Sequence, residues 1–166
     1  MIILGIDPGL AIVGWGVLDY NGSKFRVIGY GSLQTPAGMK TEDRLAAIYQ
    51  GMIQLIDTYH PEQIAVEELF FNTNITTGIR VAEARGVILL AGRQKNVALF
   101  EYTPLQVKQA VAGYGRADKK QVITMVTSLL RLKEPPKPDD TADALAIAVC
   151  HAHTGCSPLA AYYNLK

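Results

Sequence analysis

The N-terminal fifth of the chain constrains the fold more than any other part of the sequence. Three strand-like segments follow one another there with only short turns between them. Pro8-Gly9 interrupts the first junction, and Asn21-Gly22 at the second is a typical two-residue hairpin turn. Because connections this short join adjacent antiparallel strands, we predict an antiparallel three-stranded meander. The three segments are residues 2–7, 12–20 and 24–34.

After the meander, helical and strand-like patterns alternate. Apolar residues at helical spacing, such as Leu45, Ile48 and Met52, are followed by short apolar runs such as residues 64–66. Strands separated by helices pair in parallel, so these runs add parallel strands to the meander. We therefore predict an α/β protein of one domain, residues 1–166, whose mixed sheet carries helices on both faces. The predicted elements are helix 41–59, strand 63–67, helix 75–92, strand 96–102, a helix from residue 104, helix 118–132 and helix 139–153.

Local signals predict where several helices begin and end. Thr41, Asp118 and Asp139 each precede a helical pattern and are predicted to be N-cap residues. Pro104 suits the first position of its helix, and Pro61 ends the first helix. In helix 75–92, one side is predicted to carry the apolar positions Ile75, Ile79, Ala82, Gly86 and Leu89.

The composition is that of an ordinary globular protein. Hydrophobic residues make up 49% of the chain, and no apolar run approaches the ~20 residues of a membrane span. With two cysteines and no signal-peptide pattern, we expect a soluble cytoplasmic protein that does not associate with membranes. The net charge is +1, but residues 1–74 carry −4 and residues 75–166 carry +5. The basic half is compatible with a polyanionic partner or with ordinary surface charge.

Four carboxylates stand at positions that are unusual for acidic residues. Asp7 and Glu67 each end a short apolar strand, and parallel pairing of those strands would bring their ends together. Asp140 and Asp143 are three residues apart and lie on one face of the last helix. Asp143 also precedes an almost wholly apolar run that must be packed inside the protein. A carboxylate in such a place requires a partner or a coordinated cation.

A set of acidic oxygen donors is typical of a site for Mg²⁺ or Mn²⁺. Two such ions about 4 Å apart activate a water and stabilise the leaving oxygen of a phosphodiester. Each residue alone has a simpler explanation, because Asp139 or Asp140 can cap a helix and Asp7 can form a turn with Pro8. Glu68 is expected to point to the other face of its strand. The prediction therefore rests on the set of four.

Four motifs, in chain order, make the sequence resemble the RuvC-type Holliday-junction resolvases. They are GIDPG with GWGV, AVEELFF, EYTPLQVKQAVAGYGRADKKQV, and DDTADALAIAVCHAH, and they span nearly the whole chain. The opening G-I-D-x-G is shared with actin-like ATPases and sugar kinases. The final D-x-x-D-A-L-A-I-A helix, together with V-K-Q-x-V, is specific.

The resemblance implies a ribonuclease-H-like fold and a homodimer that nicks two like strands of a four-way DNA junction. It also implies dependence on Mg²⁺ and cooperation with the branch-migration motor. The family's acidic tetrad falls on the same four residues: Asp7, Glu67, Asp140 and Asp143. Its basic residues near the scissile phosphate fall on Lys108 and Lys119, and its junction-contacting aromatic falls on Phe70.

Several residues outside the motifs have roles that remain open at this stage. Arg80 and Arg85 either contact DNA phosphates or lie on an ordinary helix surface. His151, two turns after Asp143, is a candidate neighbour of the carboxylates. Helix 75–92 is the candidate dimer interface, with small residues that permit close approach and apolar residues that supply area. These residues are Gly78, Val81, Ala82, Ala84, Gly86, Val87, Ile88 and Leu89.

Three alternatives to a junction endonuclease remain. A related nuclease of the same fold would act on RNA or on another DNA structure. A fragment of an actin-like ATPase or sugar kinase would need a second phosphate-binding loop and about twice this length. A non-catalytic junction-binding protein would not need convergent carboxylates, which repel phosphates unless a metal lies between them.

Overall fold

The computed structural model describes residues 1–69 and 75–155 of the chain. Its elements follow the order expected from the sequence, with three strands first and strands then alternating with helices. Phe70 and Phe71 lie outside the described residues. The elements are β1 (Ile2–Asp7), β2 (Ile12–Tyr20), β3 (Phe25–Gln34), α1 (Thr41–Tyr59), β4 (Gln63–Glu67), α2 (Ile75–Gln94), β5 (Ala98–Tyr102), α3 (Pro104–Ala112), α4 (Lys119–Leu129) and α5 (Asp139–Thr154).

The five strands form one mixed sheet in the order β3-β2-β1-β4-β5. The first three strands pair antiparallel, whereas β4 pairs parallel to β1 and β5 pairs parallel to β4. The predicted meander and the predicted parallel extension are both confirmed. The central strand β1 therefore has an antiparallel neighbour on one side and a parallel neighbour on the other.

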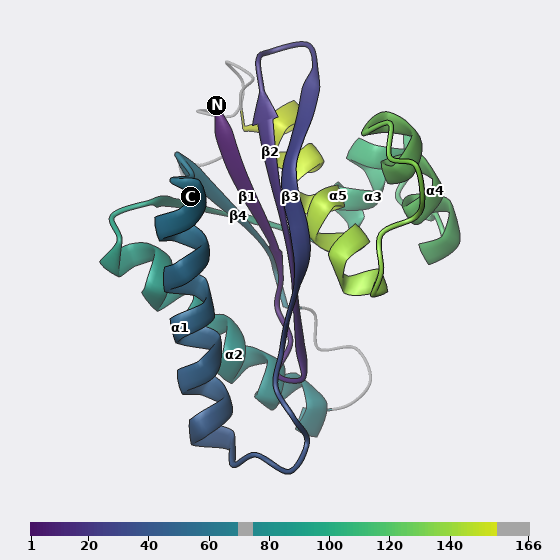
Figure 1. Ribbon diagram of the computed structural model, residues 1–166. Coiled ribbons are helices and arrows are strands. Elements are labelled where there is room, and N and C mark those ends of the chain that lie inside the picture. The colour runs from purple at the N-terminus through teal and green to yellow at the C-terminus, as the bar shows by residue number, and fades with distance from the viewer. Residues whose placement is uncertain (70–74, 156–166) are drawn as a thin grey trace.

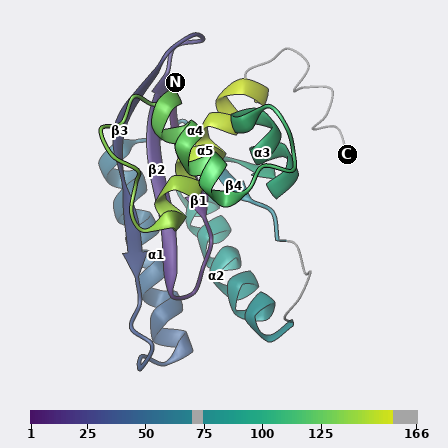
Figure 2. The ribbon, with the colours of Figure 1, turned by 90° about the vertical axis from the view of Figure 1, so that its right-hand side faces the viewer.

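Helices cover both faces of the sheet, as predicted (Figure 1). One face carries α5 with α3 and α4 beyond it, and the other carries α1 and α2; the view turned by 90° shows the same two layers (Figure 2). Side chains of β1 alternate between the two cores. Ile3 belongs to the core under α5, and Leu4 and Ile6 belong to the core under α1 and α2. Asp7, which has the same parity as Ile3, therefore faces the α5 layer.

Glycines in β1 and β2 allow α5 to lie unusually close to the sheet. A Cβ atom at Gly14 would come within 2.0 Å of the Asp140 carbonyl oxygen. At Gly5 it would come within 2.2 Å of the Ala144 carbonyl oxygen. Any larger residue at either position would push the helix away, so these two glycines fix the height of the acidic start of α5 above the strands.

Two predicted N-caps are wrong. Thr41 is the first residue of α1, and its N-cap is Lys40, which makes no side-chain capping bond. Asp139 likewise opens α5 as its first helical residue, after Pro138. For Asp139, an acidic residue is favourable in a first turn as well as at a cap, so the two positions are hard to separate by sequence. The N-cap at Asp118 is confirmed.

The face of α2 that enters the core is not the side on which the sequence places Ile79 and Gly86. Ile79 and Gly86 are on its outer side, and the residues that enter the core are Ala84, Ile88 and Ala91. Apolar residues surround this helix almost completely, so periodicity could not identify the inner face. Several bounds differ slightly: β3 begins at Phe25, α2 extends to Gln94, β5 begins at Ala98, α4 runs from Lys119 to Leu129 and α5 extends to Thr154. Within the described residues, no helix has the length and apolar character needed to span a bilayer.

Candidate active site

Two of the predicted carboxylates lie at the ends of neighbouring parallel strands. Asp7 is the last residue of β1, and Glu67 is the last residue of β4. The register pairs Ile6 with Val66, so the two carboxylates follow at the same level of the sheet. Ile6 and Val66 point into the core under α1 and α2, which directs the next residues toward α5.

The start of α5 brings the other two carboxylates to the same edge of the sheet. Asp140 and Asp143 lie in its first two turns on one face. Gly14, whose missing side chain admits the Asp140 backbone, is the residue that pairs with Asp7 across the β1–β2 ladder. All four carboxylate residues are partly buried. Four negative charges thus gather where two strands end and one helix begins.

The pKa of Asp7 shows how strongly these charges act on one another. Burial raises the pKa of Asp7 well above its usual value, and the charges of Glu67, Asp143 and Asp140 raise it further. Lys119 opposes this rise only in part. Asp7 is therefore the residue on which the fields of the other three carboxylates converge, and its ionised form requires an additional cation.

Glu67 is perturbed in the same direction. Burial and the charge of Asp143 raise the pKa of Glu67 to about 7, against the opposing charges of Lys119 and Lys108. Lys108 comes from the middle of α3, a helix that begins with a capping box between Thr103 and Gln106. The structure thus brings the two lysines predicted for the scissile phosphate into the electrostatic range of the same carboxylate.

Lys119 is the cation in direct contact with the acidic cluster. It is the first residue of α4, which Asp118 caps in a capping box with Gln121. The Lys119 Nζ lies 2.9 Å from Asp143 Oδ2 and 3.8 Å from Asp139 Oδ2. Partial burial lowers the pKa of Lys119, but the hydrogen bond and the charge of Asp143 outweigh it and raise the pKa overall.

The donor set fits a hard divalent cation. Carboxylate oxygens are the preferred ligands of Mg²⁺ and Mn²⁺, and the raised pKa values of Asp7, Glu67 and Asp143 record positive charge that the protein itself does not supply. Within residues 1–69 and 75–155, no three His, Cys, Asp or Glu side chains already close around one point. Mutual repulsion keeps carboxylates apart until a cation lies between them, and Mg²⁺ takes few protein ligands per ion.

Three further residues predicted from the sequence have different outcomes. Phe70 lies outside the described residues. Arg80 is exposed on α2 and lines a pocket that reaches Asp140. Arg85 lies instead against β5, where its Nη2 forms an ion pair with Glu101 Oε1 at 2.5 Å.

The suggested position of His151 near the carboxylates is wrong. Its Nδ1 lies 2.7 Å from the hydroxyl of Tyr102, and its Nε2 lies 2.5 Å from Oε1 of Gln63. Because Gln63 starts β4 and Glu67 ends it, His151 lies toward the opposite end of that strand. Burial lowers the pKa of His151 to about 4, so the ring is neutral and serves the core.

Two contributors to the site were missed by the sequence interpretation. Gly14 sets the position of Asp140, and its signal was the repeated glycine in G-W-G opposite Asp7. Arg44 is buried in the pocket beside Asp140, and no periodicity separated it from the exposed residues of α1. Both act through packing between distant segments, which spacing along the chain does not reveal.

Comparison with known proteins assigns the family. The family model described as "Crossover junction endodeoxyribonuclease RuvC" matches residues 3–151. The crossover junction endodeoxyribonuclease RuvC of Alkaliphilus oremlandii is 57% identical over 155 residues, covering 93% of this chain and 94% of that protein. Two structures of Thermus thermophilus RuvC, one in complex with Holliday junction substrate, are 37% and 35% identical, with TM-scores of 0.85 and coverage of 93% of this chain and 95% of theirs. The ribonuclease-H-like fold is thereby confirmed, and the chain belongs to the RuvC family of crossover junction endodeoxyribonucleases.

Proposed function

We propose that the chain is an endonuclease that resolves four-way DNA junctions by hydrolysing phosphodiester bonds. One observation carries the proposal: three carboxylates act on Asp7, which ends the central strand, while Lys119 contacts one of them. Family membership and the junction complex of Thermus thermophilus RuvC support the substrate. The proposed reaction is a pair of symmetric nicks in two like strands, one at each active site of a dimer.

The carboxylates hold the divalent cations in this proposal. Asp7, Glu67, Asp140 and Asp143 are the ligands for two Mg²⁺ ions, which Mn²⁺ can replace. When bound, such ions make water a stronger nucleophile and stabilise the leaving oxygen. Since burial and neighbouring charge raise the pKa of Glu67 to about 7, the protein holds a proton there near neutral pH. Binding of cations and binding of protons therefore compete at this edge of the sheet.

The two lysines orient the phosphate that is cut. Lys119 sits at the N-terminus of α4, where the backbone N–H groups and the helix dipole also favour a phosphate. The Lys119 ammonium group, 2.9 Å from Asp143 Oδ2, would bind a phosphate oxygen of the substrate at the same place. Lys108, on the Glu67 side, binds the strand from α3. Phe70 is proposed to stack on an unpaired base near the junction centre, a contact worth roughly 1–3 kcal/mol.

The outer face of α2 supports the homodimer. Ile79 and Leu90 are 52% and 51% exposed, and a Cβ at Gly86 would have no atom within 4 Å. Spacings of seven and four residues put these three positions on one side of the helix. Ala84 and Ile88, which we expected at the interface, lie in the core instead. A second copy packed on this face would present two active sites to a junction of matching two-fold symmetry.

Two parts of the proposal concern the cell. The branch-migration motor is the proposed protein partner, and the cytoplasm is the proposed location. Copurification of the motor with the protein on junction DNA would test the first, and a fluorescent fusion would test the second.

A synthetic four-way junction incubated with the protein and Mg²⁺ tests the central proposal. We expect paired nicks in two opposed strands and no cutting of a linear duplex of the same sequence. Binding without nicks under both Mg²⁺ and Mn²⁺ would favour the non-catalytic junction-binding protein. Cutting of RNA or of flap and fork DNA in preference to the junction would favour the related nuclease.

A further inference from the structure

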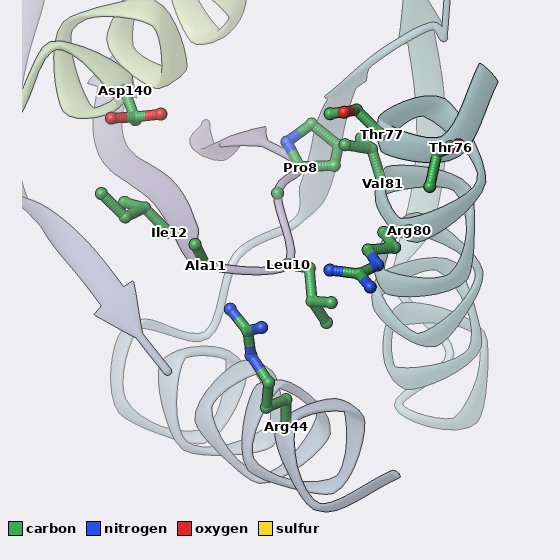
Figure 3. Close-up of a pocket in the computed structure, with 11 residues that line it drawn as sticks. Pro8, Leu10, Ala11, Ile12, Arg44, Thr76, Thr77, Arg80, Val81 and Asp140 are labelled. Atoms are coloured by element: carbon green, nitrogen blue, oxygen red, sulfur yellow. The ribbon is translucent and has the colours of Figure 1, made fainter. Parts of the chain in front are cut away.

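A pocket beside the candidate active site contains a buried arginine that the proposed reaction leaves without a role. The pocket lies between the segment that joins β1 to β2 and helices α1 and α2, and Asp140 is at one side of it (Figure 3). Its volume is about 530 Å³, which lies in the usual range of small-ligand sites. The arginine is Arg44, which enters from α1.

Arg44 is 8% exposed, yet no carboxylate among the described residues lies within ion-pair distance of its guanidinium group. Its Nε donates to the Thr35 hydroxyl at 2.7 Å, and its Nη2 donates to the Thr35 carbonyl at 3.4 Å. That hydroxyl in turn donates to the Leu10 carbonyl at 2.5 Å, which ties the guanidinium to the segment after Asp7. Among the residues that the structure describes, Arg44 has no ion-pair partner. A buried guanidinium with uncompensated charge is costly unless an anion binds it.

Arg80 adds a second positive charge to the same pocket. It is exposed on α2 and, within the described part of the chain, has no carboxylate within ion-pair distance. Figure 3 shows the guanidinium groups of Arg44 and Arg80 directed at the β1–β2 segment from two different helices. Thr76 and Thr77 line the pocket near Arg80. Two cations thus face one anion, Asp140, across the pocket.

We propose that this pocket binds a backbone phosphate of the strand being cut, adjacent to the scissile phosphate. The proposal rests on the proposed function, because it takes the carboxylates as the place of cleavage. Guanidinium groups bind phosphate oxygens through paired hydrogen bonds. Asp140 belongs to both the pocket and the acidic cluster, so the pocket adjoins the carboxylates and a strand bound there is within reach of Arg44 and Arg80. Free inorganic phosphate has the same chemistry, and the experiments below separate the two sources.

The consequence is a defined register for the strand. Contacts to phosphates position a nucleic acid without reading its sequence. If one phosphate is held at Arg44 and Arg80, the next phosphates along the strand fall at fixed places relative to Asp7 and Asp140. Loss of the pocket then shifts or spreads the sites of cutting, which a general loss of stability would not do.

The first experiment tests the pocket without DNA. The Nε–H resonances of the arginines are followed by NMR while inorganic phosphate is added at constant ionic strength. We expect the Arg44 and Arg80 resonances to shift with one common dissociation constant, while that of Arg26, already paired with Asp19, stays in place. Unmoved Arg44 and Arg80 resonances would overturn the proposal, whatever the protein does to junctions.

The second experiment combines protein variants with neutral methylphosphonates placed one at a time near the cut. Asp7→Asn protein is used so that binding is measured without cleavage. We expect one methylphosphonate position to weaken binding about tenfold, the size expected of one charge-assisted hydrogen bond. Adding Arg80→Gln or Arg44→Gln should weaken binding of the unmodified junction by the same factor. In these variants, the methylphosphonate at the sensitive position should cause no further loss of binding. Adding the control change Arg26→Gln should leave the tenfold loss intact.

Cleavage by the parent protein makes the outcomes distinguishable. In that background, Arg80→Gln should also broaden the distribution of cut sites. Suppose that the parent protein cuts junctions, but the loss of binding from the arginine change and the loss from the methylphosphonate multiply at every position. The pocket then does not hold the strand, and this proposal fails while the proposed function stands. If NMR shows phosphate binding yet no position is sensitive, the pocket serves free phosphate, which also overturns it. If the parent protein neither binds nor cuts junctions, the proposed function fails first and this inference fails with it.

Discussion

Both ends of α5 carry buried or partly buried titratable groups, but the protein supplies full partners for them at one end only. At its start, burial and the charges of Asp143 and Asp140 raise the pKa of Asp7, and burial and the charge of Asp140 also raise that of Asp143. Toward its other end, His151 is fully buried but makes hydrogen bonds with both ring nitrogens, to Tyr102 and Gln63. The same helix thus contains one polar group that the protein satisfies by itself and one that it leaves in need of cations.

The difference indicates which end is structural and which is functional. A satisfied polar group in a core restricts the packing to one arrangement. An unsatisfied acidic cluster costs stability, so it persists only where something outside the chain completes it. The comparison makes opposite predictions for the two ends, and the following changes test them in order of decreasing expected effect.

Asp7→Asn should have the largest effect, with opposite signs on activity and stability. We expect junction cleavage to fall on the order of 10³-fold or more, because a cation ligand is lost. Junction binding should persist or tighten, since a negative charge facing phosphate is gone. Without divalent cations at pH 8, the variant should melt a few degrees higher than the parent protein. A folded variant that melts lower would contradict the proposed charge repulsion.

Gly14→Ala should disturb the acidic end through packing alone. The new Cβ would meet the Asp140 carbonyl at 2.0 Å, so α5 must move away from the sheet. We expect a loss of about 3 kcal/mol in unfolding free energy, measured by chemical denaturation, together with a loss of cleavage. Gly38→Ala is the matched control, because a Cβ there meets no atom within 4 Å. Equal stability of the two variants would refute the close-approach argument.

Lys119→Gln, compared with Lys120→Gln, should show whether the lysine in contact with Asp143 has a specific role in cleavage. Since Lys119 contacts Asp143 and Lys120 is an exposed residue on the next position of α4, the two changes remove the same charge. We expect Lys119→Gln to lower single-turnover cleavage about 10²-fold and Lys120→Gln to change it only slightly. Similar losses for both would mean that the lysine acts through general charge rather than at the site.

The His151 end should respond to pH in the opposite sense from the acidic end. Burial lowers the pKa of His151 to about 4 from its usual 6.5, so the unfolded chain binds more protons between these values. The contribution of neutral His151 to the free energy of unfolding is complete above pH 6.5. As the pH falls toward 4, about 3 kcal/mol of this free energy is lost. Glu67, whose pKa is raised to about 7, instead loses stability as the pH rises from 4.5 to 7.

Unfolding free energies between pH 4 and 7 measure this difference. In an Asp7→Asn/Glu67→Gln background, stability should increase with pH over the His151 range, and His151→Gln should flatten the curve. His153→Gln, at an exposed position on the same helix, should leave the slope unchanged. A slope that survives His151→Gln would assign the pH dependence to another group.

The sequence predicted some features of the fold and of the acidic site but not others. The antiparallel meander, its parallel extension and the four carboxylates followed from local patterns, such as a two-residue hairpin turn or an apolar run that ends in an acid. The roles of Gly14, Arg44 and His151 depend on which distant segment packs against each of them, and nothing in their own neighbourhood encodes that. The inner face of α2 could not be identified from the sequence for a related reason, because Ile79 and Leu90 are as apolar as the residues that enter the core.

Titration of Mg²⁺ into the protein by calorimetry, in two buffers of different ionisation enthalpy, tests the central claim most directly. Because burial and the charge of Asp143 raise the pKa of Glu67 to about 7, Mg²⁺ binding at pH 7 must release protons from this carboxyl group. Asp7→Asn should weaken the binding and reduce the release. Binding with no proton release at pH 7, or binding unchanged by Asp7→Asn, would contradict the account of the acidic end of α5 as a cation site.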